Sequence, residues 1–193
     1  MERISLDFPE GRAAFAARFS ARTPNPITDD FLTQCRCVGF AEKGELVGGY
    51  LVNCSPPYRY IRKIPADQRG ETVDLYLAEN QCVELACMWI NWARISRGQR
   101  ALVYLNALYD ALTAGRRWIV CGTVKEKIGL THKLIFRREV YKGPTTFPGH
   151  PDGEIYAASR WEVLRRIPSA LIRDRRRRRI KQSLAPRADT STS

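Results

Sequence analysis

The sequence predicts a single domain of the α+β class, with a central mixed sheet and a basic tail at its C-terminus. Three observations support this prediction. A length of 193 residues suits one domain with a full core. Strand-like apolar runs alternate with segments of helical periodicity. From residue 167 onward the core pattern stops and arginine dominates. We therefore expect a folded domain over residues 1–166 and a disordered or helical tail over 167–193.

The first third of the chain predicts a helix, a loop and a hairpin. Residues 9–20 carry Pro9 in the first turn and an apolar face of alanine and phenylalanine, and Asp7 is placed to cap the helix. Residues 21–30 hold two prolines and predict a loop. Residues 34–41 and 45–53 predict paired strands, because both are rich in strand-forming side chains and Gly44 stands in the short turn between them.

The middle of the chain predicts two buried strands joined by a helix. In the strand over residues 81–90, simple alternation puts Val83, Leu85, Cys87 and Trp89 on one face and Glu84, Ala86, Met88 and Ile90 on the other. A cationic loop follows over 91–99. Residues 101–114 predict a helix, with an apolar stripe of Ala101, Leu105, Leu108 and Leu112 and with Gly115 after its end. The second strand covers 118–124, so the unit predicts one right-handed parallel crossover.

The remaining segments are less regular. Residues 54–70 carry three prolines and predict an irregular loop, 125–138 can form a helix, 142–153 predict a Pro/Gly loop, and 154–161 predict the last strand. The expected order is helix, hairpin, strand, helix, strand, helix, strand.

Charge and cysteine usage narrow the classes of function. The net charge is +12, and +8 of it falls from residue 160 onward, so the domain itself is only mildly basic. Six cysteines without a C-x-x-C pair favour a reduced, cytoplasmic setting. His132 and His150 lack the spacing of a zinc site, so we expect no metal. We also expect no secretory signal and no transmembrane helix, since no run of about 18 apolar residues exists.

The order of these elements carries a resemblance. The hairpin, the strand over 83–89, the cationic loop before Ala101 and the strand over 118–124 with its following helix resemble the GNAT-type N-acyltransferases. They are also similar to the related acyl-homoserine lactone synthases. The resemblance covers roughly residues 31–161 and leaves the two subfamilies open. It implies transfer of an acyl group from acyl-CoA, or from acyl-carrier protein, to an amine.

The resemblance also implies a cofactor site along the central strand and the loop that follows it. Coenzyme A would contact the strand end and place its pyrophosphate at the start of the next helix, where free N–H groups and the helix dipole attract anions. The residues at these positions are Met88, Trp89, Ile90, Arg97, Gly98, Gln99, Arg100 and Ala101. The chain departs from the family pattern at Ile95 and at Arg100. The alternative interpretation is an ordinary solvated helix start.

Two residues are candidates for proton transfer. Glu84 lies in an otherwise apolar strand, where a carboxylate is costly unless it is paired, and the resemblance implies a general base on this strand. The alternative is that Glu84 faces solvent or pairs with an arginine. The family's usual acid is a tyrosine, but Phe136 holds the matching position, which leaves Tyr141 as the candidate.

A second class of function uses the tail. Residues Arg173 to Lys181 could follow the phosphates of RNA or contact an anionic membrane, while the loop around Tyr58 to Arg62 could stack on bases. In that case the core would be a catalytically degenerate relative of the transferases. Binding of a thioester separates the two hypotheses, because a protein that only binds nucleic acid should not bind one.

Overall fold

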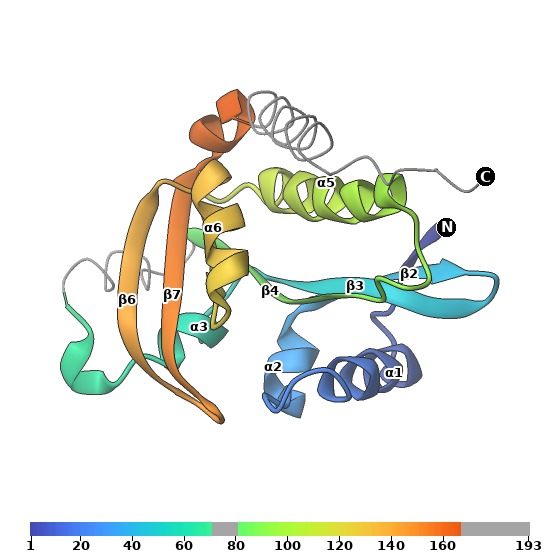
Figure 1. Ribbon diagram of the computed structural model, residues 1–193, viewed down its shortest axis with the longest axis horizontal. Coiled ribbons are helices and arrows are strands. Elements are labelled where there is room, and N and C mark those ends of the chain that lie inside the picture. The colour runs from blue at the N-terminus through green and yellow to red at the C-terminus, as the bar shows by residue number, and fades with distance from the viewer. Residues whose placement is uncertain (71–80, 167–193) are drawn as a thin grey trace, which may run out of the picture.

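The computed structural model describes residues 1–70 and 81–166, and a single seven-stranded sheet runs through them. The strand order is β1-β2-β3-β4-β5-β7-β6 (Figure 1). Neighbouring strands are antiparallel except for β4 and β5, which are parallel. The strands are β1 (Glu2–Ser5), β2 (Arg36–Glu42), β3 (Glu45–Asn53), β4 (Cys82–Ile90), β5 (Trp118–Thr123), β6 (Arg138–Phe147) and β7 (His150–Ser159).

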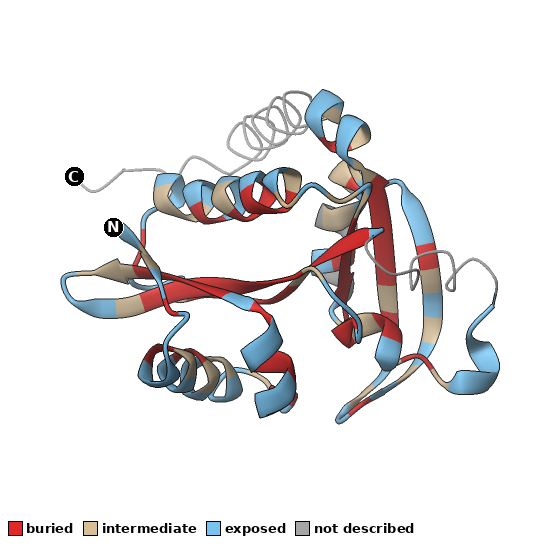
Figure 2. Ribbon diagram, turned by 180° about the vertical axis from the view of Figure 1, so that it is seen from behind, coloured by how far each residue is buried: buried red, intermediate tan, exposed pale blue. Residues whose placement is uncertain are grey.

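Helices cover both faces of this sheet. The described helices are α1 (Pro9–Ser20), α2 (Asp29–Gln34), α3 (Arg59–Arg62), the 3-10 turn η1 (Ala66–Gln68), α5 (Arg97–Thr113) and α6 (Glu126–Ile135). Helix α5 lies on the opposite side of the central strands from α1 and α2 (Figure 1). Figure 2 shows that the central strands are buried along most of their length, whereas β6 at the edge is largely exposed. The predicted α+β fold is therefore confirmed.

The predicted parallel crossover is confirmed, with α5 as its helix. Helix α5 starts earlier than expected because Ser96 and Gln99 form a capping box, and it ends before Gly115, whose φ is 76°. The predicted apolar stripe is confirmed at Leu108 and, in part, at Leu112, but Ala101 and Leu105 are exposed. Val103, Ala107, Leu108, Asp110 and Ala111 are the buried positions. The core face accommodates Asp110 because its carboxylate is paired with Arg3 and Arg36 and accepts a hydrogen bond from Tyr50.

A β-bulge in β4 overturns the predicted alternation of its side chains. The register with β3 shifts by one residue between Gly49 and Leu51, and Cys87 has a φ of 52°. Val83 and Ile90 pack in the core below α5, whereas Ala86, Cys87 and Trp89 pack in the core beside α1. Strict alternation fails because two consecutive residues, Ala86 and Cys87, face the same side of the sheet.

Other expectations are partly confirmed. The hairpin of β2 and β3 forms with Lys43 and Gly44 at positive φ. Asp7 does not cap α1, whose N-cap residue is Phe8. The Asp7 carboxylate instead accepts a hydrogen bond from the Cys37 backbone N–H. The predicted loop over 142–153 is wrong, since β6 and β7 pair across it, and α2 lies partly in the segment predicted as a loop. The N-terminal strand β1 was not predicted.

Among residues 1–70 and 81–166, no helix is long and apolar enough to cross a membrane. The predicted tail, with Arg173 to Lys181, lies outside the described residues. The boundary at residue 166 therefore stays a prediction.

Candidate functional site

The centre of the sheet opens where β4 and β5 part. The two strands pair in parallel from Cys82 with Trp118 to Leu85 with Cys121, and the ladder ends there. The bulge in β4 follows immediately, so Cys87 and Met88 lie outside the ladders to both β3 and β5. Residues at a bulge leave the regular ladder, so the backbone groups of Cys87 and Met88 are candidates for contacts with a ligand where the sheet splits.

Close packing of α1 fixes the bulged end of β4. Gly49 of β3 pairs with Trp89 of β4. A Cβ on Gly49 would lie 2.5 Å from the Val38 carbonyl oxygen and 2.7 Å from Cε2 of Phe15. Glycine therefore lets Phe15 approach the sheet, where its ring packs against Trp89 with centroids 6.3 Å apart. This contact holds Trp89 on the α1 side of the sheet.

A cavity of about 550 Å³ occupies the opening between β4 and β5. Its wall combines the end of β4 with residues from both faces of the sheet. Tyr104 of α5 and Ile128 of α6 contribute from one face, and Arg22, Arg59 and Tyr60 from the other. The remaining wall residues are Phe19, Thr23, Asn25, Cys87, Met88, Trp89, Ile90, Asn91, Trp92, Ala93, Thr123, Val124, Lys125 and Phe147. The cavity therefore connects the two faces through the gap.

The part of the wall on the α1 side is aromatic and cationic. Tyr60 reaches it because Gly122 of β5 leaves room: a Cβ there would lie 2.5 Å from the Tyr60 ring. The Tyr60 ring packs edge-on against Phe147, with centroids 5.8 Å apart. The Arg22 guanidinium lies 4.6 Å from the centroid of the Trp89 ring. The described wall holds no Asp or Glu, so its formal charge is positive.

Glu84 lies directly behind this wall. Its side chain is fully buried and does not line the cavity. Its two carboxylate oxygens accept hydrogen bonds of 2.8 Å from the backbone N–H groups of Arg59 and Tyr60, the first residues of α3. Burial raises the pKa of Glu84 to about 7, and the two N–H donors limit the rise. Near neutral pH the group can therefore hold or release a proton.

The predicted cofactor residues separate into two sets. Met88, Trp89 and Ile90 line the cavity. Arg97, Gly98, Gln99, Arg100 and Ala101 form the first turn of α5 and do not line it.

The start of α5 is tied to its own loop. The Arg100 side chain donates to the carbonyl oxygens of Ile95 and Trp92 and lies over the Trp92 ring at 4.7 Å. Arg97 and Gly98 are exposed, and their N–H groups belong to the first turn, which has no intrahelical acceptors.

Tyr141 lies away from the cavity. It belongs to β6, separated from β4 by β5 and β7, and it does not line the wall. Its hydroxyl is 2.6 Å from the Pro144 carbonyl oxygen and 2.7 Å from Oε1 of Gln68. The predicted roles of Glu84 as base and Tyr141 as acid stay predictions.

Sequence reasoning missed several wall residues. Arg59 and Tyr60 belong to the loop that the sequence suggested only for stacking on nucleic acid. Arg22 and Asn25 lie in a segment that carried no signal beyond its prolines. Their convergence depends on α1 and α3 crossing the same face of the sheet, which local patterns do not encode.

Several solved structures have a fold similar to that of this chain. FeeM, an N-acyl amino acid synthase from uncultured soil microbes, matches 86% of this chain and 99% of its own, with 14% identity and a TM-score of 0.63. A structure described as a GNAT-family acetyltransferase, from Desulfovibrio desulfuricans, matches 82% and 98%, with 10% identity and a TM-score of 0.53. An aminoglycoside 6'-N-acetyltransferase complexed with coenzyme A matches 83% and 97%, with 15% identity and a TM-score of 0.51.

No model of a known protein family matches the sequence, and no curated protein matches it either. The likeness is therefore one of structure. The domain has the fold of the GNAT-type N-acyltransferases, as the sequence resemblance implied.

Proposed function

We propose that this protein transfers an acyl group from a coenzyme A-type thioester to an amine. The observation that carries the proposal is the cavity that crosses the gap between β4 and β5 beside the bulge of β4. A reaction between two substrates needs both to meet at one point, and a cavity open to both faces of the sheet provides that point. The complex of a similarly folded acetyltransferase with coenzyme A supports this class of donor.

The donor would enter on the side of α5 and α6. The free N–H groups at the start of α5 and the exposed Arg97 suit a pyrophosphate. Met88 and Ile90 provide an apolar wall for the pantetheine arm and the acyl chain. The backbone of Cys87 and Met88, outside both ladders, supplies polar groups for the thioester carbonyl. An acyl-carrier protein would present the same arm and stays an alternative donor.

The chemistry is a nucleophilic acyl substitution. The ammonium group first loses a proton to become a neutral amine, the lone pair of the amine then forms a bond to the carbonyl carbon, and the nitrogen releases a second proton to solvent as the amide forms. The carbon–sulfur bond breaks, its electron pair leaves with sulfur, and the thiolate takes a proton from solvent or from an acid. We propose Glu84 as the final proton acceptor, because its pKa of about 7 matches a base that works near neutral pH. Since Glu84 lies behind the wall, the proton would reach it through a bridging group.

Calorimetric titration of coenzyme A into the full chain tests donor binding. Arg97→Ala should weaken binding by about 1–3 kcal/mol, the size of a charge-assisted contact to phosphate. Arg62→Ala is the matched control, because Arg62 is also an exposed helical arginine but belongs to α3 and not to the first turn of α5. Negligible heat with coenzyme A and with long-chain acyl-CoA would refute the donor site.

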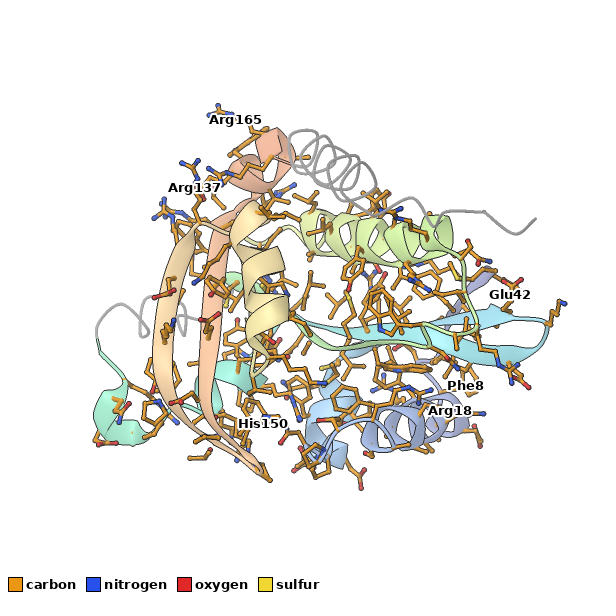
Figure 3. The ribbon with its side chains drawn as sticks, in the orientation of Figure 1. Phe8, Arg18, Glu42, Arg137, His150 and Arg165 are labelled. Carbon is orange, nitrogen blue, oxygen red and sulfur yellow. The ribbon has the colours of Figure 1, made fainter. Side chains whose placement is uncertain are left out.

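A second candidate function is binding of RNA through the predicted tail. Arginines of the described domain favour it, because several of them gather where β5 begins and β7 ends. The Arg160 N–H donates to the Arg117 carbonyl oxygen, and Arg137 and Arg165 lie at the same end of the molecule (Figure 3). A tail that starts after residue 166 would extend this basic surface. Deletion of residues 167–193 should abolish salt-sensitive binding of single-stranded RNA, and unchanged binding would refute this role. Parallel titrations with anionic vesicles decide whether a membrane is the true partner.

A further inference from the structure

The charge of the cavity wall suggests what the acceptor carries besides its amine. An enzyme that binds a simple ammonium group gains from a carboxylate in its wall, and the described wall has none. It has instead the three cationic residues Arg22, Arg59 and Lys125. A wall of this kind repels an acceptor whose only charge is positive.

Arg59 is the best-defined of these cations. Its residue is 8% exposed, and its backbone is held by the Glu84 carboxylate. One guanidinium nitrogen, Nη2, donates to the carbonyl oxygens of Asn25 and Pro26 at 3.1 Å each. The guanidinium also lies 5.5 Å from the centroid of the Phe147 ring. Within residues 1–70 and 81–166 it forms no ion pair. The guanidinium interacts electrostatically with the Glu84 carboxylate but makes no direct ion pair with it, so an anionic ligand in contact with the guanidinium would further offset the cost of its burial.

Two unsatisfied polar atoms lie in the same part of the wall. Within the described residues, Nε1 of Trp89 and Oδ1 of Asn25 are buried and have no hydrogen-bond partner, and each residue is only 5% exposed. An indole N–H is a donor and suits a carboxylate oxygen, whereas an amide oxygen is an acceptor and suits an ammonium group. Buried atoms of this kind are normally satisfied, and a ligand that reached them would supply their partners.

On the basis of the proposed transfer to an amine, we propose that the acceptor is an amine with a neighbouring carboxylate, as in an α-amino acid. Arg59, with Arg22 and the Trp89 indole N–H, binds the carboxylate, and Oδ1 of Asn25 accepts from the amine. The rings of Phe19, Tyr60 and Phe147 form an apolar surface for a hydrophobic or aromatic side chain. The phosphates of the donor are not the anion at this point, because Arg22 directly follows α1 and Arg59 begins α3, and both helices lie on the opposite face of the sheet from α5.

Three acceptors of one shape test the proposal: phenylalanine, phenylalanine amide and 2-phenylethylamine. The full chain is incubated with each acceptor and long-chain acyl-CoA, and the amide product is measured by mass spectrometry together with the released thiol. We expect kcat/KM for phenylalanine to exceed that for the other two by about 10- to 100-fold, the factor for a charge-assisted contact. Equal rates for all three, or a preference for 2-phenylethylamine, would overturn the carboxylate site and leave acyl transfer standing. Thioester binding without any amide product from these or other amines would refute acyl transfer itself.

Variants assign the effect to the arginines. Arg59→Gln should lower kcat/KM for phenylalanine at least tenfold and change that for 2-phenylethylamine little, with Arg62→Gln in the same helix as control. Arg59 also donates hydrogen bonds to the carbonyl oxygens of Asn25 and Pro26, so its replacement can disturb the structure. Arg22→Gln provides a second test at an exposed position. Its control is Arg18→Gln, at an exposed position one turn earlier in α1 (Figure 3). Thermal melting verifies that each variant is folded. A parallel loss for both acceptors in folded Arg59→Gln and Arg22→Gln would contradict carboxylate recognition.

Discussion

Replacement of Glu84 by glutamine should change how the stability of the domain depends on pH. The carboxyl group is fully buried, with its oxygens on the N–H groups of Arg59 and Tyr60. Its pKa is about 7 in the folded protein, compared with an ordinary value of 4.5. Glutamine keeps the shape and one acceptor oxygen but cannot ionise. The variant therefore removes the titration and leaves the packing almost unchanged.

The sign and size of the effect follow from proton linkage. Below pH 4.5 both the folded and the unfolded chain hold the Glu84 proton, and the group contributes no pH dependence. Between pH 4.5 and pH 7 the unfolded chain releases the proton while the folded chain keeps it, so the free energy of unfolding falls with rising pH. At about 1.4 kcal/mol for each pH unit, the total fall is about 3 kcal/mol. Above pH 7 the loss is complete and constant.

Urea unfolding of both proteins from pH 4 to pH 8 measures this term. His132 acts in the opposite direction, because burial lowers its pKa to about 4 and so stability rises with pH between 4 and 6.5. The difference between wild type and Glu84→Gln cancels that contribution and should itself change by about 3 kcal/mol. Glu10→Gln, on the exposed side of α1, is the control. Parallel curves for wild type and Glu84→Gln would refute the raised pKa and with it the proposed base. If Glu84 is the base, the same variant should also slow turnover about a hundredfold while thioester binding is retained.

Further predictions concern packing and the tail. Gly49→Ala should lower stability by about 1–3 kcal/mol, because the new Cβ would meet backbone and the Phe15 ring. Gly98→Ala, with nothing within 4 Å of the new Cβ, should be neutral or stabilising, and thermal melting compares the two. Asp110→Asn should cost about 1–3 kcal/mol in urea unfolding, since it removes the charge that Arg3 and Arg36 share while solvent still screens these two half-exposed arginines, and an unchanged midpoint would contradict a structural role for Asp110. Deletion of residues 173–193 should leave the melting temperature nearly unchanged, whereas unfolding would place the domain boundary later than predicted.

The sequence predicted those parts of the fold that depend on local signals. The hairpin follows from the turn at Gly44, and the crossover follows from two apolar runs around a well-marked helix. Local signals were insufficient for β6, where prolines and glycines favour a loop but pairing with β7 forms a strand. Local signals also predicted only in part which face of α5 is buried. Asp110 lies on that face because its carboxylate pairs with Arg3 of β1 and Arg36 of β2, which are far away in the sequence.

The site was predicted less completely than the fold. Position along β4 identified Met88, Trp89 and Ile90, which line the cavity. The first turn of α5 was predicted because the resemblance implies a pyrophosphate site at a helix start, yet the Arg100 side chain is bound inside its own loop. Arg59 could not be chosen at all, because its place in the wall depends on α3 being held by Glu84 across the fold.

The extra residue in β4 has a consequence for how this chain tolerates insertion and deletion. A substitution at Cys87 alters one side chain, whereas deletion of Cys87 would remove the bulge itself. Because Ala86 and Cys87 face the same side of the sheet, the shortened strand would alternate regularly, and Met88, Trp89 and Ile90 would keep their present faces. One missing codon at this point would therefore straighten the strand without exchanging the donor and acceptor surfaces. A variant of that kind should fold, and it would lose only the irregular backbone at the centre of the site.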